Sequence, residues 1–215
     1  MHRAGTISWQ IREGIDKHLA MALYIRDAAG LDPYVVTEPD VGALHPTVLS
    51  QPTDQTGASV DATLDLRAAV QQWPTWWARA LQQVPATTVE EAQEAAPPSP
   101  PEWHGVHDLP AVRALVQRHH RDFWSWLDTA DQGELDRYRG QRGSGDPLHL
   151  TRFVNAHEHQ LKRPARPFTL HLRLLPLQQP VGWVLDEQQV VLSTGLREDA
   201  RALEQLLAPV IAGLA

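Results

Sequence analysis

The stretch that decides the fold class is Phe168-Thr-Leu-His-Leu-Arg-Leu174, with two apolar runs, residues 181–185 and 190–194, close behind it. In the first stretch every second residue is apolar, which predicts a strand with one buried face. The other two runs flank Asp186-Glu-Gln188 and predict a hairpin. Residues 197–212 then show helical spacing of leucines. Together they predict a three-stranded antiparallel meander covered by a helix.

The regions before this meander add helices and one or two further strands. Ile7, Ile11, Ile15 and Leu19 recur every four residues, which predicts an amphipathic helix over residues 8–29. Residues 34–38 and 60–66 have strand character. Further helices are expected at residues 74–83, 88–96, 108–127, 133–139 and 150–161. The predicted class is therefore α+β, an antiparallel sheet covered by amphipathic helices.

The clearest break in the chain is Pro97-Pro-Ser-Pro-Pro101, a composition typical of an extended polyproline linker. We therefore expect an acidic N-terminal subdomain at residues 1–96, a linker at 97–102 and a C-terminal subdomain at 103–215. The two subdomains can also pack as one domain.

Composition narrows the function classes. The chain of 215 residues has no cysteine, which excludes disulfides, thiolate metal ligands and thiol nucleophiles. No run of 18 apolar residues occurs, and the first residues lack the apolar core of a secretory signal. We therefore expect a cytoplasmic protein without a membrane partner, and no motif predicts a cofactor.

Charge is unevenly distributed along the sequence. Residues 137–173 contain eight basic and two acidic side chains, a local charge of +6, in a chain of net charge -7; the remainder then carries -13. Residues 31–66 are acidic. Such segregation favours an oppositely charged partner, but the acidic segment can equally pack on the basic one within the chain. Nucleic acid is not favoured, because the whole chain is acidic.

The residues expected to bind an anionic partner follow from this charge pattern. Trp124 joins them because it lies off the apolar face of its helix, one turn after His120, and so is expected to be exposed. The candidate set is Lys162, Arg163, Arg166, Arg173, Arg142 and Trp124, with the turn at residues 162–166 as the first place to look.

Eleven histidines raise the question of a metal site. The candidates are His104 with His107, in a turn that contains glycine, and His157 with His159. On a helix, residues two apart point about 200° away from each other, so His157 and His159 can share one ion only in an extended segment. The sequence predicts a helix there, and no metal site is therefore assigned.

Two functions remain open from sequence. The first is a binding protein that holds a protein or anionic partner on its charged surfaces, with tryptophans as anchors. The alternative is a metal-assisted hydrolase with a histidine-rich site. Whether the chain is an enzyme is not decided by any motif.

Overall fold

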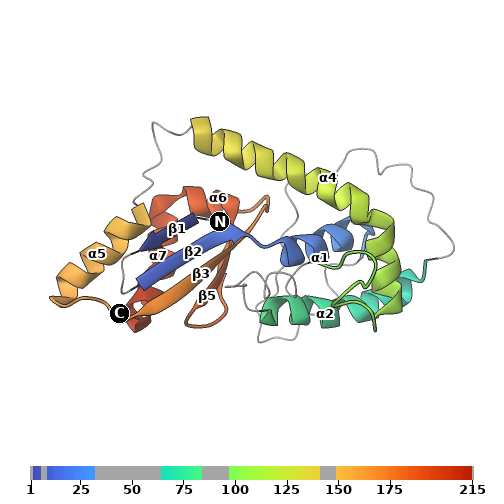
Figure 1. Cartoon of the computed structure of the whole chain (residues 1–215), viewed down its shortest axis with the longest axis horizontal. Helices are drawn as coiled ribbons and strands as arrows, with labels where there is room; N and C mark the ends of the chain where they lie inside the picture. The colour runs from blue at the N-terminus through green and yellow to red at the C-terminus, as the bar shows by residue number, and fades with distance from the viewer. Residues whose placement is uncertain (1, 6–8, 32–63, 84–96, 141–148, 215) are drawn as a thin grey trace. The chain divides into compact units, whose positions relative to one another are not determined.

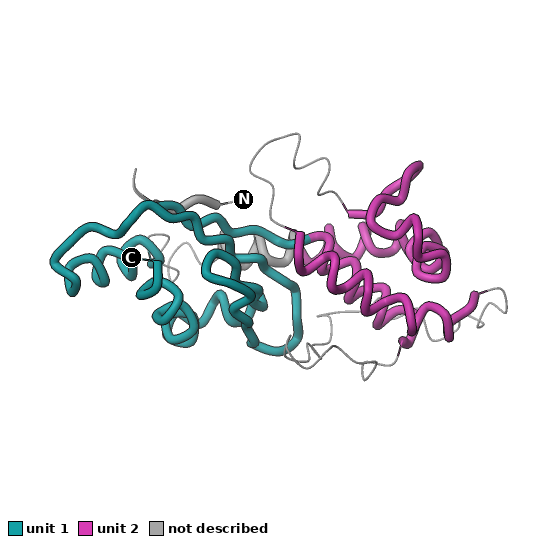
Figure 2. The backbone as a smooth tube through the Cα atoms, turned by 90° about the horizontal axis from the view of Figure 1, so that it is seen from below, with its two compact units in different colours: residues 1–16, 134–215 teal, residues 17–133 magenta. Residues whose placement is uncertain are grey.

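The computed structural model describes residues 2–5, 9–31, 64–83, 97–140 and 149–214 (Figure 1). The chain divides into two compact units: unit 1 contains residues 1–16 and 134–215, and unit 2 contains residues 17–133 (Figure 2). Unit 2 is thus inserted into unit 1 along the sequence. The proline-rich segment 97–102, where we expected a boundary, lies within unit 2.

Unit 1 is built on a five-stranded mixed sheet. Its strands are β1 (His2–Gly5), β2 (Trp9–Ile15), β3 (Phe168–Leu175), β4 (Gly182–Val184) and β5 (Gln189–Ser193), in the order β1-β2-β3-β5-β4. The central strands β2, β3 and β5 are parallel, and the outer strands β1 and β4 pair antiparallel with their neighbours. The α+β class is confirmed, but the sheet is not wholly antiparallel.

The predicted meander is wrong in one respect. β4 and β5 form the antiparallel hairpin expected at residues 181–194, but β5, not β4, lies beside β3 and runs parallel to it. The chain after β3 therefore passes to the sheet edge before it returns. Alternating apolar residues identify a strand and its buried face, but they carry no information on its neighbour or direction.

Three helices cover one face of this sheet: α5 (His149–Leu161), α6 (Thr194–Glu198) and α7 (Ala200–Leu214). Their apolar residues form one buried cluster with Phe168, Leu170 and Leu172 of β3. The single helix predicted at residues 197–212 is divided at Asp199, whose carboxylate accepts a hydrogen bond from the amide of Ala202 at 3.0 Å. Ser, Asp and Asn at such positions satisfy the first amides of a helix.

The N-terminal helix predicted over residues 8–29 is correct only in its second half. Residues 9–15 form β2, and the helix, α1, covers Lys17–Ala28. Ile11 and Ile15 are four residues apart, a spacing that fits both the two-residue period of a strand and the 3.6-residue period of a helix. Pairing with β3 decides between the two.

Unit 2 is helical in its described residues, with α1, α2 (Leu66–Gln82) and the part of α4 (Pro110–Gly140) that precedes residue 134. α2 begins eight residues earlier than Pro74, because Asp65 caps it by accepting from the amide of Ala68 at 2.9 Å. The strand expected at 60–66 is therefore wrong at residues 64–66. α4 is one helix where two were predicted at 108–127 and 133–139.

α1 forms the centre of unit 2, since every residue from His18 to Arg26 is buried. The indole of Trp73 on α2 donates to the carbonyl of Ala22 at 2.8 Å, and Tyr24 meets the edge of Phe123 on α4 with ring centroids 5.6 Å apart. Four tryptophans, Trp73, Trp76, Trp77 and Trp126, are at most 6% exposed. These tryptophans are therefore core residues.

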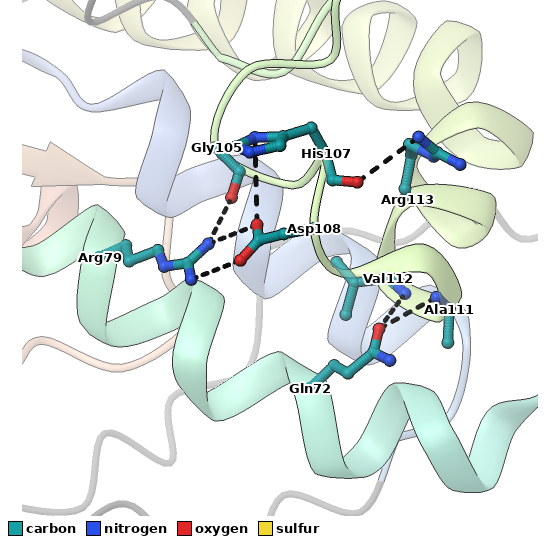
Figure 3. Close-up of polar contacts among 8 residues, drawn as sticks. All are labelled: Gln72, Arg79, Gly105, His107, Asp108, Ala111, Val112 and Arg113. Atoms are coloured by element: carbon teal, nitrogen blue, oxygen red, sulfur yellow. Dashed lines mark hydrogen bonds and ion pairs between the residues drawn. The ribbon is translucent and has the colours of Figure 1, made fainter.

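A neutral contact joins α2 to the first turn of α4. The Gln72 side-chain oxygen accepts from the amides of Ala111 at 3.0 Å and Val112 at 3.3 Å (Figure 3). These amides lack partners inside their own helix. Gln72 therefore performs from another helix the task that an N-cap residue usually performs.

Two sequence predictions fall outside the described residues: the strand at 34–38 and the helix at 88–96. Among the helices that the structure does describe, none is both long and apolar enough to cross a bilayer.

Candidate functional site

The second face of the unit 1 sheet carries buried polar and charged side chains. Side chains alternate along β3, so His171 and Arg173 project away from the face that holds Leu170 and Leu172. The register places Arg12 of β2 and Gln189 of β5 on either side of His171. Because neighbouring strands are about 4.8 Å apart, these three side chains form one row across the sheet.

Arg173 is held by one partner at the end of β2 and one on β5. It is 2% exposed, and its Nε donates to Asp16 at 2.7 Å while its Nη1 donates to Gln189 at 3.2 Å. The Gln189 amide in turn donates to Asp186 at 2.8 Å. Asp16 follows directly after β2, so the end of that strand supplies the counter-charge for Arg173.

Arg12 lies in the same row, but the described residues contain no carboxylate that pairs with it. Its Nη2 donates to Gln10 at 3.3 Å, whereas its Nε and Nη1 are closed to solvent and donate to no acceptor in the described part of the chain. A guanidinium does not give up its proton in proteins. Burying charged donors without acceptors is costly, and each unsatisfied group costs about 1–3 kcal/mol.

Burial and the nearby arginines both affect the pKa of His171. It is 6% exposed, and its Nδ1 has no hydrogen-bond partner among the described residues. Burial lowers the pKa of His171 below its usual 6.5, and the charges of Arg12 and Arg173 lower it further, against an opposing effect of Asp186. The imidazole is therefore neutral near pH 7. An anion placed between Arg12 and His171 would raise that pKa again.

The row can bind an anion. Arg12 has two charged N–H donors without acceptors in the described residues, Nε and Nη1, which point to different sides of its guanidinium, and His171 stands beside it. Charged donors of this kind suit a carboxylate or phosphate. The row crosses the three parallel strands of the sheet, near the middle of β2 and β3 and at the first residue of β5. Buried groups with perturbed pKa values also concentrate at functional sites.

The structure separates the anion-binding residues expected from sequence. Lys162, Arg163 and Arg166 lie exposed on the turn between α5 and β3, where the Glu158 carboxylate accepts from the amide of Ala165 at 2.9 Å. Lys162 has a positive φ of 54° at the end of α5. Arg173, by contrast, is buried near the other end of β3. The turn and Arg173 therefore do not form one site.

The two remaining candidates lie elsewhere. Arg142 falls outside the described residues. Trp124 of α4 belongs to unit 2 and is half-buried: its indole donates to His120 Nε2 at 3.0 Å, and the ammonium of Lys17 lies 5.5 Å from its ring centre. The expected aromatic surface is thus partly covered by the chain's own lysine.

The histidines considered as metal ligands are also distributed over both units. His104 and His107 are exposed in a turn of unit 2, and His157 and His159 lie on α5 in unit 1, two residues apart on a helix. Within the described ranges, no three histidine or carboxylate side chains gather as metal ligands would.

Arg12 and His171 were not singled out from the sequence. His171 alternates with leucines beside Arg173, so the strand pattern did place both on one face. Arg12 was assigned to a helix, and its position beside His171 could not be found without the parallel pairing of β2 and β3. Comparison with protein-family models, curated proteins and solved structures finds no match for this chain.

Proposed function

We propose that this chain is a binding protein that holds an anionic group of its partner on the polar face of the unit 1 sheet, through Arg12, His171 and Arg173. The observation that carries the proposal is the Arg12 guanidinium, which has two donors closed to solvent and no acceptor among the described residues. A partner carboxylate or phosphate would supply these acceptors.

Arg173 and Asp16 prepare this site. Because Arg173 already has Asp16 as its partner at 2.7 Å, it adds positive potential without needing the ligand for its own stability. Gln189 fixes the other side of the Arg173 guanidinium. The site is therefore preorganised, which lowers the entropy lost on binding.

The proposed partner is a protein side chain, a phosphorylated residue or a small ligand that presents one such group. A metal-assisted hydrolase, the alternative from sequence, has no comparable supporting observation in the described residues. The acidic segment 31–66 of the chain itself remains a competing source of carboxylates, and the test must separate the two.

The test uses inorganic phosphate as the probe and the unfolding temperature of the full chain as the measurement. A ligand that binds only the folded state raises this temperature with concentration. We expect sodium phosphate to stabilise the protein beyond sodium chloride of equal ionic strength. We expect Arg12→Gln to abolish the difference and Arg166→Gln, the same charge change at an exposed position, to retain it.

Two results would contradict the proposal. One is an Arg12→Gln protein that responds to phosphate as the unmodified protein does. The other is a response to phosphate that equals the response to chloride in all three proteins, which is the result expected if carboxylates of the chain itself occupy the Arg12 donors.

A further inference from the structure

A second, separate feature is a pocket in unit 2 with a volume of about 330 Å³. It is formed by α1, α2 and the turn at residues 104–108. Ala80 and Trp76 of α2 lie at its base, 1% and 0% exposed, and His18 of α1 also lines it. Ligand pockets begin at about 300 Å³, so the space suits a ligand of one or two rings.

Arg79 connects the turn that lines the pocket to α2. The Arg79 guanidinium donates with both terminal nitrogens to the Asp108 carboxylate, at 2.7 and 2.8 Å, and reaches the carbonyl of Gly105 at 3.5 Å (Figure 3). The Asp108 carboxylate neutralises the charge of Arg79. We call this contact the Arg79–Asp108 clamp.

Gly105 allows the turn to approach α1. Its φ is +80°, a region that residues with a side chain rarely adopt, and a Cβ at this position would lie 3.5 Å from His18 Nε2. The pocket wall is therefore assembled from three elements that fix one another.

The polar side chains of this wall include one donor-only group, the Arg79 guanidinium, beside histidines and glutamines that can both donate and accept. Its eight residues include one arginine, two histidines and two glutamines, and none is acidic. In the described part of the chain, the buried indole nitrogen of Trp76 has no acceptor. Arg79 bonds to Asp108 and Gly105 through its terminal nitrogens. Asp108 uses only the terminal end of the guanidinium, so the Nε side remains available to a second acceptor.

The larger part of the wall surface is apolar. A ligand with a flat apolar body and one acceptor-rich end matches such a wall: the body would lie over Ala80, and the acceptor would meet Arg79 and His104. A carboxylate accepts several hydrogen bonds and is favoured by charged donors. Gln82 lines the pocket and is exposed, so a negative charge can be introduced at this position without disturbing the core.

We infer that this pocket is a binding site for a small aromatic carboxylate. The inference concerns unit 2 alone and does not depend on the anion site of unit 1. The probes are sodium benzoate and the neutral, nearly isosteric benzamide. Amide and indole N–H signals of the ¹⁵N-labelled full chain would be followed by NMR during titration.

We expect saturable shifts at the Gly105 amide and the Trp76 indole with benzoate, and at least tenfold weaker binding of benzamide. Gln82→Glu should weaken benzoate binding about threefold, since a unit charge about 6 Å away contributes a repulsion of this order in water. Gln71→Glu is the matched control: it is exposed on the same helix, 11 residues or about 16 Å away, and should change little.

Absence of saturable benzoate binding would overturn the inference. Equal binding of benzoate and benzamide would also overturn it, as would equal effects of Gln82→Glu and Gln71→Glu. Arg12→Gln should leave benzoate binding at Gly105 unchanged, which separates this result from any failure of the unit 1 site.

Discussion

Each unit of the molecule contains an arginine–aspartate pair with its shortest contact at 2.7 Å, but in opposite surroundings. In unit 1, Arg173 and Asp16 are 2% and 14% exposed; in unit 2, Arg79 and Asp108 are both 43% exposed. The contact geometry is similar and the solvation is not. Solvation therefore decides what each pair does.

The exposed Arg79–Asp108 clamp holds a turn but contributes little to the free energy of unfolding, because water competes with both partners. The buried pair is different. Its charges have lost most of their hydration, and removal of one leaves the other buried without the opposite charge it pairs with. Arg12 extends the comparison, because it is a partly buried guanidinium on the same sheet face without a carboxylate partner in the described residues.

The largest effect is expected at the buried pair. Arg173→Met removes the positive charge that pairs with Asp16 at 2.7 Å, and we expect the free energy of unfolding to fall by about 3–5 kcal/mol. Urea unfolding followed by circular dichroism measures this. Arg166→Met, at an exposed site, serves as the control and should change stability by less than about 0.5 kcal/mol. Equal losses in the two variants would erase the distinction between the pairs.

Replacement of Arg12 should increase stability, whereas replacement of Arg173 should lower it. Arg12→Met removes donors that lack acceptors in the described residues and keeps most of the apolar stem. We therefore expect the free energy of unfolding in phosphate-free buffer to rise by about 1 kcal/mol. The same urea titration applies. A loss of stability would mean that Arg12 is satisfied in the free protein, and it would remove the main support for the anion site.

The pH dependence of unit 1 should follow His171. Its pKa is lowered in the folded state, so the unfolded chain binds this proton more readily. The stability associated with His171 is therefore complete above pH 6.5 and declines as pH falls below 6.5 toward the folded-state pKa. NMR titration of the His171 ring protons, with His171→Gln as the control for stability, checks this. A His171 pKa at or above 6.5 would contradict it.

The smallest effect is expected at the Arg79–Asp108 clamp. Hydrogen bonds from Arg79 lower the pKa of Asp108 from 3.8 to about 2. The contribution of the clamp is thus present above pH 3.8 and is lost as pH falls from 3.8 to about 2. Asp108→Asn should match the unmodified protein in urea midpoint at pH 2 and differ slightly at pH 7, less so in high salt. If Asp108→Asn lowered stability at pH 7 as much as Arg173→Met does, exposure would not distinguish the two pairs.

The sequence predicted the parts of the fold that depend on local periodicity. β3, the β4–β5 hairpin and the helix at 150–161 all appear where apolar spacing places them. The failure at residues 8–15 has a clear cause: Ile11 and Ile15 suit two periodicities, and nothing local reveals that β2 pairs with β3. The candidate site depended on that same pairing, which is why Arg173 was found and Arg12 was not.

The lysine- and arginine-rich turn at 162–166 shows what charge composition can and cannot predict. Composition there indicates a basic surface, and these side chains are indeed exposed. Composition does not indicate that Arg173, seven residues after Arg166, turns to the buried side of a strand. Charge counted along a sequence therefore describes the surface poorly where a strand intervenes.

The insertion of unit 2 between β2 and β3 has a consequence for synthesis on the ribosome. Trp9 pairs with Phe168, so 159 residues separate two neighbours in the sheet. At about 5–20 residues per second, β2 leaves the ribosome roughly 8–30 s before its central partner exists. All of unit 2 emerges within that interval. The nascent chain must therefore keep β2, whose edge toward β3 is still unpaired, from aggregating until translation is nearly complete.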